Sequence, residues 1–555
     1  MREEVSSKIS GDSPDCINII EKVDEALVKE ALTKMKCGKS DPLFDYTSDM
    51  LINGPPTLIS HVTNMIKSWL VHGSVPYFLL VCTLIPLVKN QIGDIASSDN
   101  YRGIAQSSLM LKLLDWIILL LESEKLSVDQ LSFGYQKLVS TSMCTWGINA
   151  VVEHYNRQGC PVYGCAADMS KAFDVIEWLP LFKELLKRQV NPIFLRILLH
   201  IYVHQKCDVR WNGVWSTRFP VFNGVRQGAM TSAIFFNVFM DRLIKNLRKA
   251  DLGCHVFGEF IGVFIYADDI FLLSPSRPGL QAMVDNCSKF AQENSLKFST
   301  NPDPKLSKTK CIIFSKNIND RVNVTPIILN GDPLPWVPEV LHLGHHLECD
   351  GSMKLDIAIK RGRFIGKVTS LKQEFNFVTP EVKMNLFNIY TKSFYGSNLW
   401  NINSKECHRL YSSWNIAVRE CFQISRKTHR YLIEDISHSQ HPLVVISSRL
   451  VQFDKSLTES SKPSIRLLAN ITRKDCRTFH GKNLKFITNK CDLTNIDELT
   501  STLVKSSMKY VPIPNDESWR LDIISEMLAI KEDSFYIENF DKQDINNMLE
   551  LLCVT

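Results

Sequence analysis

The chain has 555 residues, which is too long for one hydrophobic core, so roughly three or four domains or subdomains are expected. Its 45% hydrophobic and 22% charged residues exclude a disordered or fibrous class, and its net charge of +5 permits a polyanionic partner without requiring one. Sixteen cysteines without a C-x-x-C pair, and a start without a secretory leader, indicate reduced thiols in an intracellular protein. The most apolar windows are shorter than the ~20 residues of a membrane span, so no membrane partner is expected.

The first 20 residues are polar and are expected to form a loose lead-in. Helical periodicity follows over residues 23–35 and 58–70. A strand over residues 82–88 then ends at Lys89, and a second extended segment carries Arg102. Fixed cations at the ends of short extended segments suit phosphate contacts, although spacing alone favours a solvated surface charge.

Residues 162–167 form a short apolar run that predicts a strand ending at Asp168, just before a helix. Open α/β sheets place active-site groups at such strand ends. The alternative is a helix N-cap, for which Asp174 is the better candidate because it lies closer to the periodic run. Further along, two glycines flank Gln227 in a polar loop, where they allow close backbone approach to a ligand.

Two adjacent carboxylates, Asp268 and Asp269, lie between apolar runs that are long enough to be buried strands. Burial of one ionised carboxylate costs several kcal/mol unless it is paired or metal-bound, and two like charges side by side increase that cost. We therefore expect two strands joined by a tight turn, which places both carboxylates at the rim of a hairpin where a cation binds them.

Beyond residue 351 the pattern is largely helical and contains a basic segment with Lys360, Arg361, Arg363 and Lys367. Cations interleaved with aromatic residues are typical of a groove that follows a nucleic-acid backbone, but a solvated helix face accounts equally well for any single one of them. The polar stretch 454–464 is expected to be a linker, and residues 465–555 show no specific chemistry.

Taken in order, these segments resemble the reverse transcriptase of non-LTR (LINE-type) retrotransposons over roughly residues 25–350. The combination of blocks is more specific than any one of them. The blocks are Leu84-Ile85-Pro86-Leu87-Val88-Lys89, Asn100-Tyr101-Arg102, Asp168-Met169-Ser170-Lys171-Ala172-Phe173-Asp174, Gly224-Val225-Arg226-Gln227-Gly228, Tyr266-Ala267-Asp268-Asp269, Ser307-Lys308-Thr309-Lys310 and His342-Leu343-Gly344.

The resemblance implies an α+β fold of the right-hand polymerase type. Its parts would be a lead-in (1–20), fingers (21–155), a palm with an antiparallel sheet and helices (156–350), a helical thumb-like region (351–453), the linker (454–464) and a mainly helical C-terminal extension (465–555).

The resemblance also implies an RNA-directed DNA polymerase, with an RNA template, a DNA primer and dNTPs as partners. Nucleotidyl transfer of this kind calls for two divalent ions, Mg²⁺ or Mn²⁺, about 3.5–4 Å apart. Asp168 and Asp268 would bridge both ions, with Asp269 in support.

By the same resemblance, Lys89 and Arg102 would neutralise the incoming triphosphate, and Gln227 and Gly228 would line the nascent base pair. Lys308 would lie near the pyrophosphate as a general acid.

Two of these assignments have alternatives. Lys310 lies in the same block as Lys308 and is an equally good candidate for the general acid. Phe173, five residues after Asp168, would be the steric gate that excludes a ribose 2′-hydroxyl, and the alternative is a core phenylalanine at a helix start.

Two segments depart from the family pattern. The usual Gly-Arg-Ser-Thr of the fingers appears as Leu138-Val139-Ser140-Thr141, and the usual Leu-Ser-Pro after Gly228 appears as Thr231-Ser232-Ala233. These changes bear on template or nucleotide affinity and leave the carboxylates intact. A catalytically impaired nucleic-acid-binding relic is therefore the alternative function, and an RNA-templated RNA polymerase is a third, which Phe173 argues against.

The chain starts at the fingers without the endonuclease domain that such elements generally carry. We therefore expect a fragment or a truncated copy that works with a separate endonuclease. Family behaviour predicts that the protein occurs in the nucleus and cytoplasm.

Overall fold

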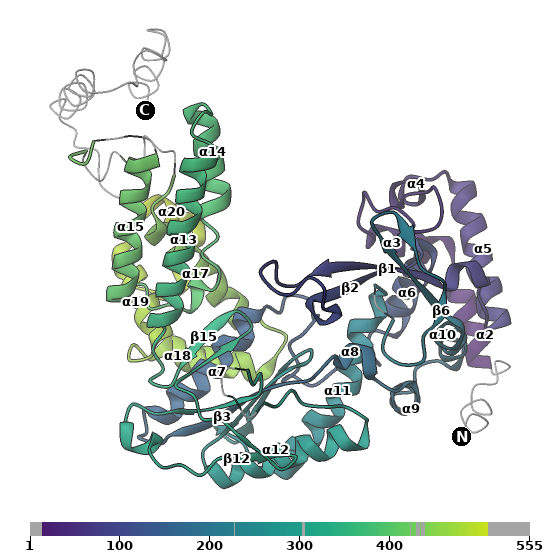
Figure 1. The fold of residues 1–555 in the computed structure, drawn as a ribbon, viewed down its shortest axis with the longest axis horizontal. Helices are drawn as coiled ribbons and strands as arrows, with labels where there is room; N and C mark the ends of the chain where they lie inside the picture. The colour runs from purple at the N-terminus through teal and green to yellow at the C-terminus, as the bar shows by residue number, and fades with distance from the viewer. Residues whose placement is uncertain are drawn as a thin grey trace. The chain divides into compact units, whose positions relative to one another are not determined.

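The computed structural model describes residues 14–226, 228–301, 303, 306–421, 423, 425–428, 433–434 and 439–508. It divides into two compact units (Figure 1). Unit 1 comprises Met1–Gly351 together with Ser460–Leu468, and unit 2 comprises the remainder. The division at residues 351 and 352 coincides with the place where the sequence changes to a largely helical pattern.

One part of unit 1 combines the N-terminal helices with a mixed sheet, to which residues 206–220 return. The strand order of this sheet is β2-β1-β4-β5, with β6 paired to β4. The most apolar helix of this part, α6, is buried on most sides because most of its residues are leucine, isoleucine or methionine. The helices are α2 (Pro14–Lys22), α3 (Glu25–Thr33), α4 (Ser48–Ile52), α5 (Pro56–His72) and α6 (Leu109–Glu122); the strands are β1 (Val81–Val88), β2 (Tyr101–Gln106), β4 (Lys206–Trp211), β5 (Val214–Trp215) and β6 (Phe219–Pro220).

A second, fully antiparallel sheet in unit 1 has the order β11-β3-β10-β9, as expected for a palm. Strand β3 lies inside it between β11 and β10, and helix α12 packs against β3 and β10 (Figure 1). The strands are β3 (Val162–Asp168), β9 (Val263–Tyr266), β10 (Asp269–Ser274) and β11 (Lys310–Phe314); the helices nearby are α7 (Thr141–Asn156), α8 (Ala172–Val175), α9 (Trp178–Lys187), α10 (Pro192–His204), α11 (Met230–Ala250) and α12 (Arg277–Glu293).

Three two-stranded hairpins complete unit 1. The His342-Leu343-Gly344 block forms the turn of the last one, where Leu343 and Gly344 have φ of 49° and 78°, a backbone that matches the twist of paired strands. The His342 ring is buried 5.0 Å from that of Phe271, so this block braces the second sheet. The hairpins are β7 (His255–Val256) with β8 (Glu259–Phe260), β12 (Ile327–Leu329) with β13 (Asp332–Leu334), and β14 (Glu339–His342) with β15 (His345–Glu348).

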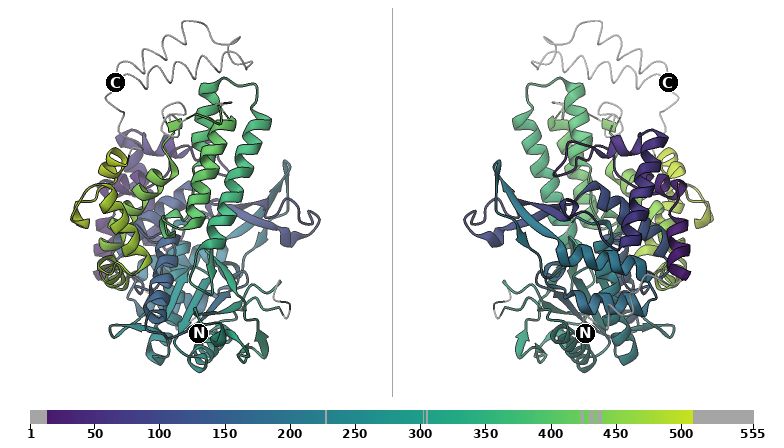
Figure 2. Two further views of the ribbon diagram at one scale, coloured as in Figure 1. Left: turned by 90° about the vertical axis from the view of Figure 1, so that its left-hand side faces the viewer. Right: turned by 90° about the vertical axis from the view of Figure 1, so that its right-hand side faces the viewer.

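The described part of unit 2 is helical, as the sequence predicts beyond residue 351, and its core is built around the fully buried Trp400 and Trp414. Helices α13 and α14 lie side by side as long rods (Figure 2). The helices are α13 (Lys354–Glu374), α14 (Pro380–Thr391), α15 (Lys405–Cys421), α17 (Pro442–Thr458), α18 (Pro463–Lys474), α19 (Phe479–Lys490) and α20 (Ser501–Ser507); short 3₁₀ turns across both units are η1 (Tyr77–Leu80), η2 (Ser98–Asn100), η3 (Ile318–Arg321), η4 (Ser397–Leu399) and η5 (Ile496–Glu498).

The stretch 454–464, expected to be a linker, consists of the end of α17, a four-residue turn and the start of α18. Several of its polar residues, Asp454, Ser460, Lys462 and Ser464, are buried; Asp454 accepts hydrogen bonds from His480 at 2.8 Å and Arg473 at 3.1 Å. The linker prediction rested on the polar composition of this stretch. Composition does not distinguish polar residues that are buried and hydrogen-bonded from polar residues that are exposed to solvent. Of the C-terminal extension, residues 509–555 lie outside the described residues, and no described helix is both apolar and long enough to cross a bilayer.

Candidate active site

The two adjacent aspartates lie at the end of a buried hairpin, as predicted. Strands β9 and β10 are joined by the two-residue turn Ala267-Asp268, in which Ala267 adopts a left-handed φ of 59°. The apolar residues of both strands are at most 1% exposed, so the hairpin is anchored in the core. We call residues 263–274 the aspartate hairpin.

Asp168 ends β3 and is the direct register partner of Asp269 on β10. Paired side chains in antiparallel strands have Cβ atoms roughly 4.5–5.5 Å apart and point to the same face. The Asp168 amide donates to Thr309 Oγ1 at 3.3 Å, and its carbonyl accepts from the Ser299 amide at 2.9 Å. Asp168 is therefore a strand-end carboxylate and not a helix cap, and the cap expected at Asp174 is wrong, because Asp174 lies inside α8.

The three carboxylates repel one another in a partly buried position. Burial, followed by the charges of Asp268 and Asp168, raises the pKa of Asp269 to about 6. Burial and the charge of Asp168 also raise the pKa of Asp268, while Arg102 and Lys308 oppose that rise. Both cations therefore act electrostatically on the carboxylate cluster.

Of the two candidate lysines, Lys308 is the one whose ammonium reaches the cluster. Its Nζ lies 3.6 Å from Asp168 Oδ2, and its side chain is 69% exposed. Lys310 instead opens β11 opposite Ala166. Of the two lysines that the sequence left open, the structure thus places the Lys308 ammonium beside the cluster.

The Phe173 ring is held in a fixed orientation beside the cluster. It stacks on Phe236 with ring centroids 4.1 Å apart and an angle of 4° between the planes. The Tyr135 ring stands edge-on to it at 6.0 Å. Burial and the charge of Asp268 raise the pKa of Tyr135. Sequence reasoning gave Tyr135 no role.

The two glycines of the loop before α11 allow the backbone to pack against the chain itself. Both have left-handed backbones, with φ of 85° at Gly224 and 79° at Gly228. A Cβ on Gly224 would meet the Phe173 carbonyl at 2.8 Å, and one on Gly228 would meet the Ala105 carbonyl at 2.3 Å. Gly228 is therefore fixed to the end of β2, while Gln227 lies outside the described residues.

A buried ion pair anchors this loop. The Arg226 guanidinium donates to the fully buried Asp115 carboxylate, which also accepts from the Met230 amide at 3.0 Å and Thr231 Oγ1 at 3.1 Å. The Ser232 hydroxyl donates to the Arg226 carbonyl. Thr231, which replaces the usual leucine, and Ser232, which keeps the usual serine, thus belong to a polar network that sequence reasoning missed.

Lys89 bonds within the β1–β2 hairpin instead of turning toward the carboxylates. Its Nζ donates to the Asp99 carbonyl at 2.8 Å, and the Asp99 carboxylate lies 3.2 Å from Lys171 Nζ. The Asp99 and Lys171 side chains are 82% and 68% exposed, so solvent screens this pair.

Lys360 does not belong to an exposed basic face, and the prediction that it contacts nucleic acid is wrong. It is 9% exposed in the core of unit 2, with its Nζ 2.9 Å from Asp356 and the Trp400 indole donating to the same carboxylate at 2.8 Å. Arg363 and Lys367 are exposed one turn apart on α13, and Arg361 is half-buried.

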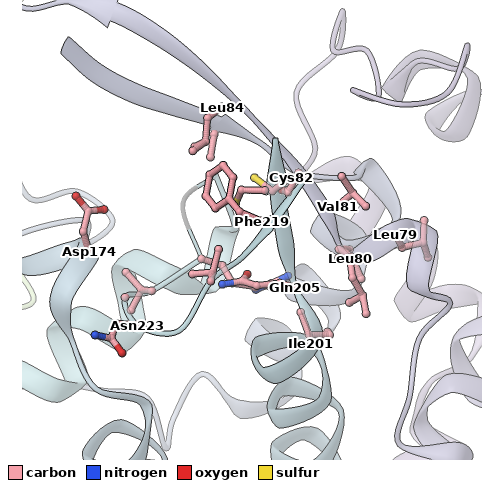
Figure 3. A pocket seen from close by; sticks show the side chains of 18 residues that line it. Leu79, Leu80, Val81, Cys82, Leu84, Asp174, Ile201, Gln205, Phe219 and Asn223 are labelled. Atoms are coloured by element: carbon pink, nitrogen blue, oxygen red, sulfur yellow. The ribbon is translucent and has the colours of Figure 1, made fainter. Parts of the chain in front are cut away.

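A cavity of about 220 Å³ lies beside the loop before α11 (Figure 3). It opens between β1, β4, α10 and residues 221–226, and Figure 3 shows Asp174 and Asn223 on one side and Leu84, Cys82 and Phe219 on the other. None of the three carboxylates lines it, so this cavity is separate from the aspartate hairpin.

The donor set of the hairpin fits a hard divalent cation by its chemistry. Mg²⁺ and Mn²⁺ prefer carboxylate oxygens, and a cation would relieve the repulsion that raises the pKa values of Asp268 and Asp269. Within the described residues, no group of three or more His, Cys, Asp or Glu side chains is arranged closely enough to hold a metal ion.

Comparison with known proteins gives a consistent family signal. Residues 89–347 match the family described as Reverse transcriptase (RNA-dependent DNA polymerase). The chain is 22% identical over 301 residues to the Retrovirus-related Pol polyprotein from type-2 retrotransposable element R2DM of Drosophila melanogaster, covering 54% of this chain and 28% of that protein. It is 29% identical over 153 residues to the corresponding polyprotein of type-1 retrotransposable element R2 of Nasonia vitripennis, covering 27% and 14%.

The chain thus spans less than a third of the length of these curated relatives. Among solved structures it is similar to apo telomerase from Candida tropicalis, with 13% identity over 56% of this chain and 62% of that one, at a TM-score of 0.35.

Proposed function

We propose that the chain is an RNA-directed DNA polymerase that extends a primer 3′ end with dNTPs on an RNA template, because residues 89–347 match the reverse transcriptase family and the chain is similar to Pol polyproteins of R2 retrotransposable elements. The observation that carries this proposal is the direct pairing of Asp168 with Asp269 across β3 and β10, with Asp268 in the adjoining turn. Three carboxylates gather at one sheet edge, where Lys308 lies 3.6 Å from Asp168 and the charge of Arg102 opposes the rise in the pKa of Asp268; this is an oxygen-donor site with cations that suit phosphate.

We assign the three aspartates as ligands of two Mg²⁺ or Mn²⁺ ions. When bound, these ions supply activation of the primer hydroxyl and neutralisation of the triphosphate. The chain's own groups do the rest. Lys308 stands 3.6 Å from Asp168 and is largely exposed, so it can meet an incoming phosphate and give up a proton.

Phe173 would discriminate between sugars. Its ring is stacked on Phe236 and packed edge-on against Tyr135, so it cannot rotate away without losing both contacts. A ring fixed in this way can exclude a 2′-hydroxyl by contact alone. Gly228, Gln227 and Lys89 stay proposed nucleotide contacts, of which Gly228 is supported by its fixed place at the end of β2.

The second candidate, a nucleic-acid-binding relic with impaired catalysis, is favoured by one specific position. Leu138 has a left-handed φ of 62° and is 87% exposed, where the resembling family carries glycine. A leucine in this conformation is strained, which weakens the loop that leads into α7. Arg361, Arg363 and Lys367 of α13 would still bind nucleic acid in such a relic.

The test is primer extension on an RNA template by the folded wild-type chain and by Asp268→Ala. Asp285→Asn, which changes an exposed carboxylate of α12, serves as a matched control. The proposal predicts dNTP- and divalent-ion-dependent extension by wild type and Asp285→Asn, and none by Asp268→Ala. Salt-sensitive template binding without extension would instead identify the relic.

Two further proposals concern the cell. We propose that a separate endonuclease supplies the nicked primer, and that the protein reaches the nucleus as well as the cytoplasm. Imaging of a tagged full chain tests the second proposal, and strict exclusion from the nucleus would contradict it.

A further inference from the structure

One segment of unit 1 comes from far along the chain. Residues Ser460–Leu468 pack with residues up to 351, although both flanking segments belong to unit 2. The segment is held by the Ser464 amide, which donates to Gln130 Oε1 at 2.8 Å, and by the fully buried Ile465, whose Cδ1 would lie 3.2 Å from a Cβ on Gly147.

Lys462 of this segment is a buried cation with neutral partners. It is 3% exposed, and its Nζ donates to the Ser132 carbonyl at 2.5 Å and to Gln136 Oε1 at 3.0 Å, 5.1 Å from the centre of the Phe133 ring. Burial lowers the pKa of Lys462 to about 8, with Asp129 and Cys144 opposing. Asp129 is itself bonded to Arg248 at 2.9 Å, so the ammonium has neutral acceptors as its direct partners.

The residues that Lys462 holds belong to the loop 131–137, which we call the clamp loop. The Ile265 amide donates to the Leu131 carbonyl at 3.0 Å, and the Phe133 amide donates back to the Ile265 carbonyl at 2.7 Å. Gly134 touches the turn so closely that a Cβ there would lie 2.7 Å from the Ala267 nitrogen. The clamp loop is thus bonded to the aspartate hairpin on both sides of Ser132.

The clamp loop also carries Tyr135, whose ring stands edge-on to Phe173 at 6.0 Å and whose pKa is raised by burial and by the charge of Asp268. Movement of the loop would therefore displace the hairpin turn and the edge of the Phe173 ring together. A buried ammonium without a counter-ion is a poor stabilising device, because an apolar side chain of the same length packs there without desolvation of a charge. A role in holding the loop explains its presence.

We propose that Lys462 is a positioning residue of the polymerase site, whose ammonium group fixes the clamp loop and, through it, the aspartate hairpin. The expected effect of Lys462 on the rate of nucleotide addition rests on the proposed polymerase function. The proposal assigns a role in the site to a residue outside the matched reverse transcriptase region, 330 positions from the carbonyl that it binds.

The test compares full-length wild type with Lys462→Met, which keeps the apolar stem and removes the charge. Lys289→Met, at an exposed lysine of α12, is the matched control. The readouts are the nucleotide addition rate per active site, with the sites counted from the burst amplitude, the template–primer Kd, and amide hydrogen exchange of residues 263–270.

For Lys462→Met we expect the addition rate per site to fall about tenfold or more, because small misplacements of catalytic groups have effects of this size. The Kd should stay within about twofold of that of wild type, and the Ile265 amide should exchange faster. Gln136→Met should show the same changes. In the double variant, the fold-decrease in addition rate should be smaller than the product of the two single fold-decreases.

A lower burst amplitude or melting temperature with an unchanged rate per site would overturn the proposal, since a merely structural residue behaves in that way. Hydrogen exchange separates this outcome from failure of the proposed function. If wild type extends no primer, the polymerase proposal fails, and the exchange of the Ile265 amide alone decides the Lys462 proposal. Unchanged exchange in Lys462→Met would contradict it.

Discussion

Asp168 and Asp269 are register partners on the adjacent antiparallel strands β3 and β10, although they are 101 positions apart in sequence. Asp268 precedes Asp269 in the turn, so three like charges gather at one edge of the sheet. This repulsion does not stabilise the fold, and clusters of like charge that destabilise a fold are typical of functional sites.

The first prediction concerns pH and the Asp269 carboxylate. Its pKa in the folded chain is about 6, above the ordinary 3.8, so folding favours its protonated form. Without divalent ions, stability should therefore fall as pH rises from about 4 to about 6 and then level off. Asp269→Asn should be more stable than wild type by about 1–3 kcal/mol at neutral pH, with the gain vanishing below about pH 4.

Denaturant unfolding in the presence of a chelator, followed at both ends of that pH range, measures this difference. Mg²⁺ should stabilise wild type at neutral pH and should stabilise Asp269→Asn less, because one ligand and one of the repelling charges are gone. A variant that is less stable than wild type at neutral pH would contradict the electrostatic account.

The second prediction concerns the Phe173 ring. Phe173→Ala should raise incorporation of ribonucleotides relative to deoxynucleotides by about 10- to 100-fold, because the ring that excludes the 2′-hydroxyl is removed. Phe257→Ala, which removes a ring that is 74% exposed, should leave the ratio unchanged. Single-nucleotide addition with matched dNTP and NTP measures the ratio, and no gain in ribonucleotide use would remove Phe173 from this role.

The third prediction concerns the buried pair of Asp115 and Arg226. Asp115→Ala leaves the guanidinium buried without its counter-ion, so it should destabilise unit 1 by about 3–5 kcal/mol. Joint replacement by apolar residues, Asp115→Leu with Arg226→Met, should be much milder. Thermal unfolding of the full chain compares the two, and an equal loss in both variants would show that the pair, and not the unpaired charge, decides stability.

The fourth prediction concerns Leu138, which has a φ of 62°. Leu138→Gly should stabilise the protein by about 0.5–1 kcal/mol, because glycine adopts this backbone without strain. Lys137→Gly, one residue earlier where φ is not positive, is the matched control and should destabilise by a similar amount. Equal effects of the two glycines on the unfolding midpoint would contradict the strain.

Much of this site could be predicted because its signals are local. The alternation of apolar runs around Asp268 and Asp269, and the strand that ends at Asp168, lie within about ten residues each, and both elements occur as predicted. Lys360 was misjudged because its partners, Asp356 and Trp400, bury it in a core that a list of charges does not show.

The missed residues depend on distant contacts. Arg226 meets Asp115 across 111 positions, and Lys462 meets Ser132 across 330 positions. No periodicity within a single segment reports such pairs. Tyr135 lies in the clamp loop, which Gly134 brings against the hairpin turn.

The most direct test of the central claim is RNA-templated primer extension by the full chain and its Asp168→Asn variant, with Asp285→Asn as control and with Mg²⁺ or Mn²⁺ present. Asp168→Asn keeps the shape of the strand end and removes one of the paired charges. We predict extension by wild type and the control and a loss of about 1,000-fold or more in Asp168→Asn, the scale at which removal of essential catalytic groups acts. Extension by Asp168→Asn at the wild-type rate would contradict the assignment of this carboxylate pair as the catalytic centre.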